Sequence, residues 1–123
     1  MTITIRVRVN LNQYPLIVEL GKMHNLEMIY YKRIWDESRG DDYDSWGSSV
    51  WYFEVCKISG ITRQQMEIYA NGQALLYDED INTFDRYGGL SEIPFDVEKC
   101  ESFEISKLEY EQLKNITKFL NTK

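Results

Sequence analysis

The 123-residue sequence has few of the residues that form covalent or metal-bound sites: two cysteines, two prolines and one histidine. Two cysteines are too few for a disulfide scaffold, so we expect Cys56 and Cys100 to be free thiols. His24 has no cysteine near it in the sequence, and neither a zinc ligand set nor an HExxH-type motif can be built around it. We therefore expect no metal and no other cofactor.

Long hydrophobic runs are also missing. Thr2, Thr4, Arg6 and Arg8 interrupt the apolar residues at the N-terminus, where a signal peptide would need a continuous apolar region. No stretch approaches the roughly 20 apolar residues that cross a bilayer as a helix. The sequence thus predicts a cytoplasmic protein without a membrane anchor.

Positive charge is in short supply. Fourteen Lys and Arg stand against twenty Asp and Glu, which gives a net charge of −6 and a pI near 4.8. Such a surface repels the phosphates of nucleic acids and anionic lipids, so we expect no direct nucleic-acid or membrane partner. A hydrophobic fraction of 43% with 14% aromatic residues is nonetheless enough for a packed core. The length fits one domain spanning residues 1 to 123.

Several segments have the pattern of β-strands. Residues 2 to 9 alternate strictly between polar and β-branched apolar residues, and residues 14 to 20, 26 to 35 and 50 to 57 have strand-like composition. Residues 63 to 70 and 73 to 77 flank Asn71-Gly72. An Asn-Gly pair supplies the two positive φ values of a type I′ turn, which predicts a β-hairpin.

One helix is expected at the C-terminal end. Ser106 followed by Glu109 forms a capping box. Apolar residues then recur at helical spacing, and they should form one stripe on a sheet face: Leu108, Leu113, Ile116 and Leu120. Lys114 and Lys118 suit the helix C-terminus. The fold class predicted is α+β, a mainly antiparallel β-sheet of about five to six strands with a C-terminal α-helix packed on one face.

No catalytic motif is complete. The run from Asp42 to Gly47 begins like a calcium loop, but Phe53 stands where the bidentate glutamate is needed. Gly88-Gly89 lacks the spacing of a phosphate-binding loop. Cys56 lies among Trp51, Tyr52 and Phe53, where cysteine behaves as a small buried hydrophobe. We therefore predict that the protein is not an enzyme.

Residues 36 to 49 and 78 to 104 have the composition of irregular chain. The negative charge is concentrated in and around these two segments. Residues 36 to 44 hold five acids against Arg39 alone, and residues 78 to 111 hold eleven acids against three bases. Acidic groups around an aromatic anchor suit the capture of a basic protein, because complementary charge raises the association rate and aromatic residues make hot spots. The alternative is an ordinary solubilising surface over core aromatics. The partner-binding residues predicted in these segments are Asp36, Glu37, Asp41, Asp42, Asp44, Trp46, Asp78, Glu79, Asp80 and Asp85.

About half of the chain, from Trp51 to Glu109, resembles a family of small acidic bacterial proteins. The motifs that carry the resemblance are Met66 to Gly72, Tyr77 to Asp80, Tyr87 to Pro94 and Glu104 to Glu111. Such proteins are similar to the immunity proteins of polymorphic-toxin and contact-dependent growth inhibition systems. The resemblance implies a cytoplasmic protein that neutralises a basic toxin domain, such as a nuclease, by occluding its active site. The alternative is a phage or mobile-element inhibitor of a host nucleic-acid-binding enzyme that acts through acidic mimicry.

Overall fold

A computed structural model describes residues 27–122 of the chain. The strands predicted for residues 2 to 9 and 14 to 20, and also His24, lie outside these residues. The described part holds a five-stranded antiparallel sheet in the order β4-β3-β2-β1-β7 and one α-helix, which confirms the predicted α+β fold. The strands of this sheet are β1 (Met28–Trp35), β2 (Ser49–Cys56), β3 (Thr62–Tyr69), β4 (Ala74–Asp78) and β7 (Glu104–Ile105).

The smaller elements lie outside the main sheet. A two-stranded ribbon is formed by β5 (Phe84–Asp85) and β6 (Gly88–Gly89). Two single turns of 3₁₀-helix are η2 (Asp44–Trp46) and η3 (Glu101–Phe103). The α-helix is α1 (Lys107–Ile116). The segment predicted to be irregular, residues 78 to 104, thus contains short strands, and its last residue begins β7, which adds an edge strand beside β1.

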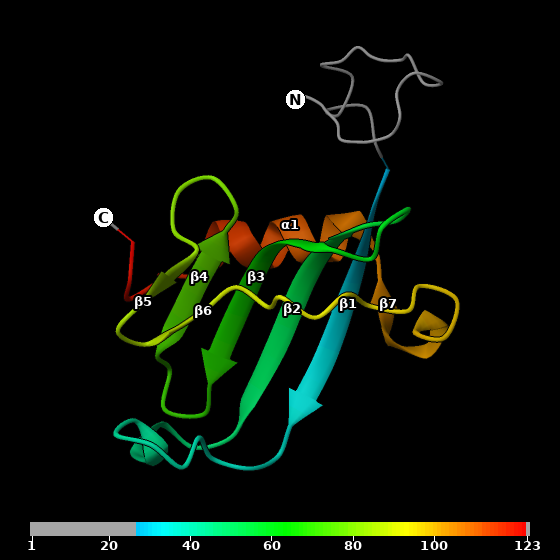
Figure 1. Ribbon diagram of the computed structural model, residues 1–123. Helices are drawn as coiled ribbons and strands as arrows, with labels where there is room; N and C mark the ends of the chain where they lie inside the picture. The colour runs from blue at the N-terminus through cyan, green and yellow to red at the C-terminus, as the bar shows by residue number, and fades with distance from the viewer. Residues whose placement is uncertain (1–26, 123) are drawn as a thin grey trace.

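Both faces of the main sheet are covered, because side chains along a strand alternate between the two faces. On one face, Tyr30, Tyr52 and Met66 pack with Tyr110 of α1. On the other face, Tyr31 and Phe53 pack against Phe95, which belongs to the chain between β6 and η3. Figure 1 shows α1 behind the sheet and the yellow segment after β6 crossing in front of it. The sheet is therefore the middle layer of three.

Helix α1 begins as predicted, but it buries a different face. The Ser106 hydroxyl accepts a hydrogen bond from the Glu109 amide at 3.0 Å, which confirms the N-terminal cap. The predicted apolar stripe is confirmed at Leu113, which packs against the core on this face, and is wrong at Leu108 and Ile116, which are 66% and 81% exposed. Tyr110 is instead fully buried, because two residues turn the helix by about 200° and so point away from Leu108.

The same helix ends earlier than the spacing of apolar residues predicted. Its last residue is Ile116, and Thr117 has extended backbone. Leu120 and Lys118 therefore lie beyond the helix, and Phe119 reaches the helix-side core in place of Leu120. The tyrosine ring of residue 110 is large enough to cover Tyr30, at 4.9 Å between ring centroids, and its hydroxyl donates to Gln64. One aromatic residue with a polar end thus replaces an aliphatic stripe.

The predicted β3-β4 hairpin is present, with a different turn. The Gly72 amide donates to the Tyr69 carbonyl, which places Ala70 and Asn71 at the central turn positions. Gly72 then takes a φ of +96°, so the connection has three residues and not the two of a type I′ turn. The Asn71 amide donates to the Trp46 carbonyl, which joins the hairpin to η2.

The two cysteines are on opposite faces of the sheet. Cys56 is 5% exposed, which confirms its predicted burial. It follows Val55 in β2, and Val55 belongs to the core cluster against which Cys100 packs. Because successive residues of a strand point to opposite faces, the sheet separates the two thiols.

One buried hydroxyl in this core has no partner. Tyr31 is fully buried, and its hydroxyl makes no hydrogen bond with the described residues. A buried polar group without a partner lowers stability by about 1 to 3 kcal/mol. We expect Tyr31→Phe to leave the free energy of unfolding unchanged or to raise it by about 1 kcal/mol, as measured by urea denaturation.

The matched control is Tyr110→Phe. Tyr110 is equally buried, but its hydroxyl donates to Gln64 at 2.9 Å. Its loss should lower stability by about 1 kcal/mol. Equal losses in the two variants would show that the Tyr31 hydroxyl has a partner after all.

Candidate functional site

The predicted partner-binding residues lie at two opposite ends of the sheet. Residues 36 to 44 follow Trp35, which pairs with Ser49 at one end of β1 and β2. Asp78 pairs with Gln64 at the far end of β4, and residues 79 and 80 continue from there. At about 3.3 Å per residue, a five-residue strand separates the two groups by roughly 16 Å. Figure 1 shows the first segment below the sheet and the second above β4.

Three of the four partner-binding residues predicted in the second segment bond to the protein itself. The Asp78 carboxylate accepts hydrogen bonds from the amides of Asp80, at 3.0 Å, and of Ile81, at 2.6 Å. Glu79 forms an ion pair with Arg63. The Asp78 side chain therefore closes the turn after β4, and Glu79 fastens that turn to β3.

Asp85 also has an internal role. Its carboxylate accepts hydrogen bonds from the Tyr77 hydroxyl at 2.7 Å, from the amide of Tyr87 at 2.9 Å and from two asparagine side chains, Asn82 and Asn121. Partial burial acts to raise the pKa of Asp85, but the donors outweigh it and the pKa is lowered. Asp85 therefore links β4, the β5-β6 ribbon and the C-terminal segment. Its carboxylate is hydrogen-bonded within the protein and is poorly available to a partner.

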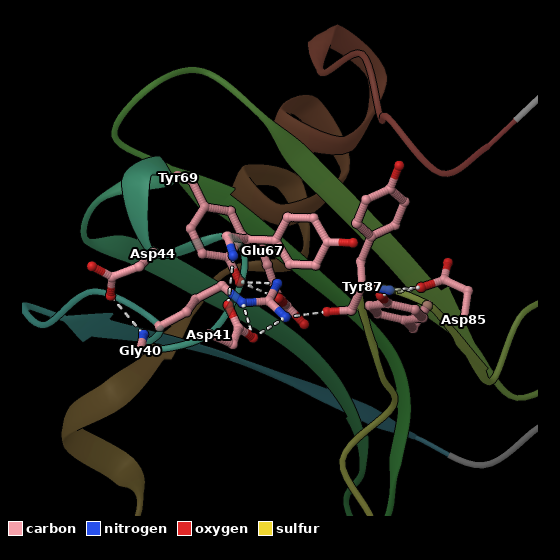
Figure 2. A network of polar contacts seen from close by, with 10 residues as sticks. Gly40, Asp41, Asp44, Glu67, Tyr69, Asp85 and Tyr87 are labelled. Atoms are coloured by element: carbon pink, nitrogen blue, oxygen red, sulfur yellow. Dashed lines mark hydrogen bonds and ion pairs between the residues drawn. The ribbon is translucent and has the colours of Figure 1, made fainter.

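The first segment, residues 36 to 44, is an acidic loop built around Arg39. The guanidinium donates from Nε and Nη2 to Asp41 Oδ2, at 3.0 and 2.8 Å, and from Nη2 to the Tyr87 carbonyl. The Gly40 amide donates to Asp44 Oδ1 at 2.7 Å (Figure 2). These bonds set the loop's conformation. Its five carboxylate residues are all solvent-exposed: Asp36, Glu37, Asp41, Asp42 and Asp44.

Two of these carboxylates are held in the charged form. The hydrogen bond from Arg39 is the largest cause that lowers the pKa of Asp41, and the Tyr43 amide adds to it. Hydrogen bonds from Ser38 and from the Gly40 amide lower the pKa of Asp44. Asp41 and Asp44 therefore keep their negative charges to lower pH than free aspartates would.

The expectation that Trp46 is an exposed anchor is wrong. Trp46 is 9% exposed and packs against Tyr69, at 5.1 Å between ring centroids, and against Tyr87, at 5.7 Å. Tyr43 adds a third ring at 4.8 Å. The Arg39 guanidinium carbon lies 5.6 Å from the Trp46 ring and 5.0 Å from the Tyr43 ring, within range of a cation–π interaction. The aromatic residues thus fasten the loop to the sheet, while the carboxylates point outward.

A buried polar network lies beneath this cluster. Glu67 is 2% exposed, and its carboxylate accepts hydrogen bonds from the Tyr69 hydroxyl at 2.6 Å and from Gln65 at 2.7 Å. Arg39 Nη1 donates to the Tyr69 hydroxyl at 3.4 Å. Gln65 also donates to the Gly89 carbonyl and accepts from the Ser91 amide. The network therefore connects β3 with both the acidic loop and the chain around β6.

The sequence analysis missed this network and gave Arg39 no role beyond its charge. Gln65 and Glu67 alternate with Met66 in β3, a pattern that reads as a strand with one polar, solvent-facing side. The aromatic Tyr69 at the next alternate position was the only available signal that this side is covered.

The network is closed off from solvent. Gln65, Glu67 and Tyr69 are at most 3% exposed, so the Glu67 carboxyl group has almost no contact with water. Within residues 27–122, no three His, Cys, Asp or Glu side chains are grouped so as to hold a metal ion. The same residues include no helix that is both long and apolar enough to span a bilayer.

Comparisons with protein-family models, with curated proteins and with solved structures find no match to this chain.

Burial of Glu67 gives stability a defined pH dependence. Desolvation raises its pKa above the usual 4.5, although Tyr69 and Gln65 oppose the shift. A carboxyl group whose pKa is raised by folding stabilises the fold fully below its unfolded pKa, and this contribution is lost as the pH rises through the folded pKa. Gln at this position does not titrate. We expect the stability of the wild type, relative to Glu67→Gln, to fall between pH 4 and pH 7 in urea denaturation.

The control for this experiment is Glu79→Gln, which removes a partly exposed carboxylate paired with Arg63. The stability of the wild type relative to Glu79→Gln should not fall as the pH rises. A constant difference between wild type and Glu67→Gln over this range would mean that the Glu67 carboxyl titrates normally.

Proposed function

We propose that the acidic loop, residues 36 to 44, is the surface through which this protein binds a basic protein partner in the cytoplasm. The observation that supports the proposal most directly is that the loop is both charged and held in place. It carries five acids against Arg39, and Arg39 is turned inward onto Asp41 and the aromatic cluster. Its conformation is fixed in the free protein, so little ordering entropy is lost when a partner binds.

The chemistry of this surface fits a partner with clustered lysines or arginines. Glu37 and Asp42 are exposed, as are Asp41 and Asp44, whose lowered pKa values extend their charge to more acidic pH. Cationic clusters of this kind are typical of proteins that bind nucleic-acid phosphates. A nuclease toxin domain is one such protein, and a carboxylate loop that covers its phosphate-binding groove would block its substrate.

We infer on these grounds that the chain acts as an immunity protein which neutralises a basic toxin domain. The burial of Trp46 changes the expected energetics. Because the loop presents carboxylates and not an aromatic anchor, long-range attraction should govern association, and the partner must supply apolar contacts elsewhere.

The test uses the protein encoded by the reading frame next to that of this chain. Coexpression should restore the growth of cells that this protein arrests. Glu37→Lys with Asp42→Lys should lower the association rate about tenfold or more and flatten its salt dependence, since charge acts mainly on the encounter. Both side chains are exposed, so circular dichroism should be unchanged.

The matched control is Asp80→Lys with Glu92→Lys. It changes the net charge by the same amount at two exposed residues outside the acidic loop, of which Asp80 lies at the opposite end of the sheet. The control should bind at nearly the wild-type rate. Equal slowing in both double variants would mean that only net charge matters, and unchanged rates in both would place the interface elsewhere.

A further inference from the structure

The two edges of the main sheet differ in how much of the edge strand is hydrogen-bonded on its outer side. At the β4 edge, the Leu120 amide donates to the Ala74 carbonyl at 2.7 Å. The side-chain amide of Asn121 then bonds both the amide and the carbonyl of Leu76, at 2.9 and 3.0 Å, as a neighbouring strand would. The Asp78 amide donates to Asn82. The C-terminal segment and the turn after β4 therefore close this edge.

Among residues 27–122, the β1 edge is covered by a neighbouring strand over only two residues. β7 pairs with Tyr30 and Tyr31 and does not continue further along β1 (Figure 1). The rest of β1 toward its C-terminal end, Lys32 to Trp35, has no neighbouring strand on this side among the described residues. Ile34 and Trp35 in this stretch are 65% and 55% exposed. An open edge of this kind is a template for pairing with another chain.

The register shows which backbone groups face the open edge. The Lys57 amide donates to the Glu27 carbonyl at 3.1 Å, so Glu27 bonds toward β2. In an antiparallel pair the bonding direction alternates along the strand. The odd-numbered residues of β1 thus bond toward β2, and the amides and carbonyls of Lys32 and Ile34 point outward.

We propose that a second copy of this chain pairs with the open edge, antiparallel to β1, about a two-fold axis at Ile34. Ile34 then lies opposite the partner's Ile34, Arg33 opposite the partner's Trp35, and Lys32 opposite the partner's Asp36. Residues 32, 34 and 36 have the same parity, so their outward backbone groups meet in hydrogen-bonded pairs. The product is a continuous sheet that runs through both copies.

A second copy is the proposed occupant because the side chains of the open stretch are complementary to those of the same stretch in antiparallel orientation. The centre joins two exposed isoleucines. The next positions join the partner's indole to the guanidinium of Arg33, which already lies 4.1 Å from the Phe103 ring of η3, and the outer positions join an ammonium and a carboxylate. Apolar, cation–π and opposite-charge pairs each stabilise cross-strand neighbours. A basic strand would instead place its cations beside Lys32 and Arg33.

The pairing shares Asp36 with the acidic loop but leaves Glu37 and Asp42, the residues that test the proposed toxin partner, outside the paired strands. The pair would carry two acidic loops, one from each copy. Failure of the dimer would therefore leave the proposed binding of a basic protein untouched, and failure of toxin binding would leave the dimer untouched.

The test is the mass of the full chain in solution, measured by sedimentation equilibrium or by light scattering after gel filtration. The wild type should be a dimer at tens of micromolar. Lys32→Glu alone and Asp36→Lys alone place like charges opposite each other, and each should raise the dimer dissociation constant about tenfold or more. The double variant restores opposite charges and should return the constant to near the wild-type value.

A backbone variant tests the edge itself. Ile34→Pro removes an outward amide and no bond to β2, so the fold should survive and the dimer should be lost. Ile34→Val keeps the amide and should remain dimeric. A wild-type chain that is monomeric at 100 μM would overturn the proposal, as would a double charge variant that dissociates like the single variants, or a dimer that persists in a folded Ile34→Pro variant.

Discussion

The packing of the acidic loop and of the chain around β6 on the sheet depends on the contacts of one group, the inward-facing guanidinium of Arg39. It bonds Asp41 within its own loop, the Tyr87 carbonyl near β6 and the Tyr69 hydroxyl of β3, and it lies against the rings of Tyr43 and Trp46. Three segments far apart in the sequence thus meet at one cation. A planar group with five donors can satisfy such divergent partners, which a lysine cannot.

That cation is needed because residues 27–122 include one α-helix for a sheet with two apolar faces. Helix α1 covers one face with Tyr110, and irregular chain covers the other. Irregular chain cannot satisfy its own backbone groups, so polar side chains must do so. Gln65 bonds the backbone at Gly89 and Ser91, and Asp85 bonds the backbone at Tyr87. Covering the face in this way also buries the Glu67 carboxyl group, which is unfavourable because burial disfavours its charged form.

The acidic residues consequently divide into two kinds. Asp78, Glu79 and Asp85 bond the protein's own backbone and side chains. In the acidic loop, Asp41 and Asp44 fix the loop and remain exposed, while Asp36, Glu37 and Asp42 extend its charge into solvent. The two acidic segments are similar in composition, but the carboxylates of the acidic loop are more available to a partner.

The sequence by itself determined the strands β1 to β4, the β3-β4 hairpin, the helix cap at Ser106 and the burial of Cys56, because alternation, turn residues and capping are local properties. Only the tertiary structure decided which sides of these elements are covered. Leu108 and Ile116 have ideal helical spacing yet face solvent, and Gln65 and Glu67 have a polar pattern yet are buried. Trp46 lies in a polar loop and is a core residue. In each case the deciding contact comes from a residue distant in the sequence, such as Tyr30, Gly89 or Tyr69, and no local pattern encodes it.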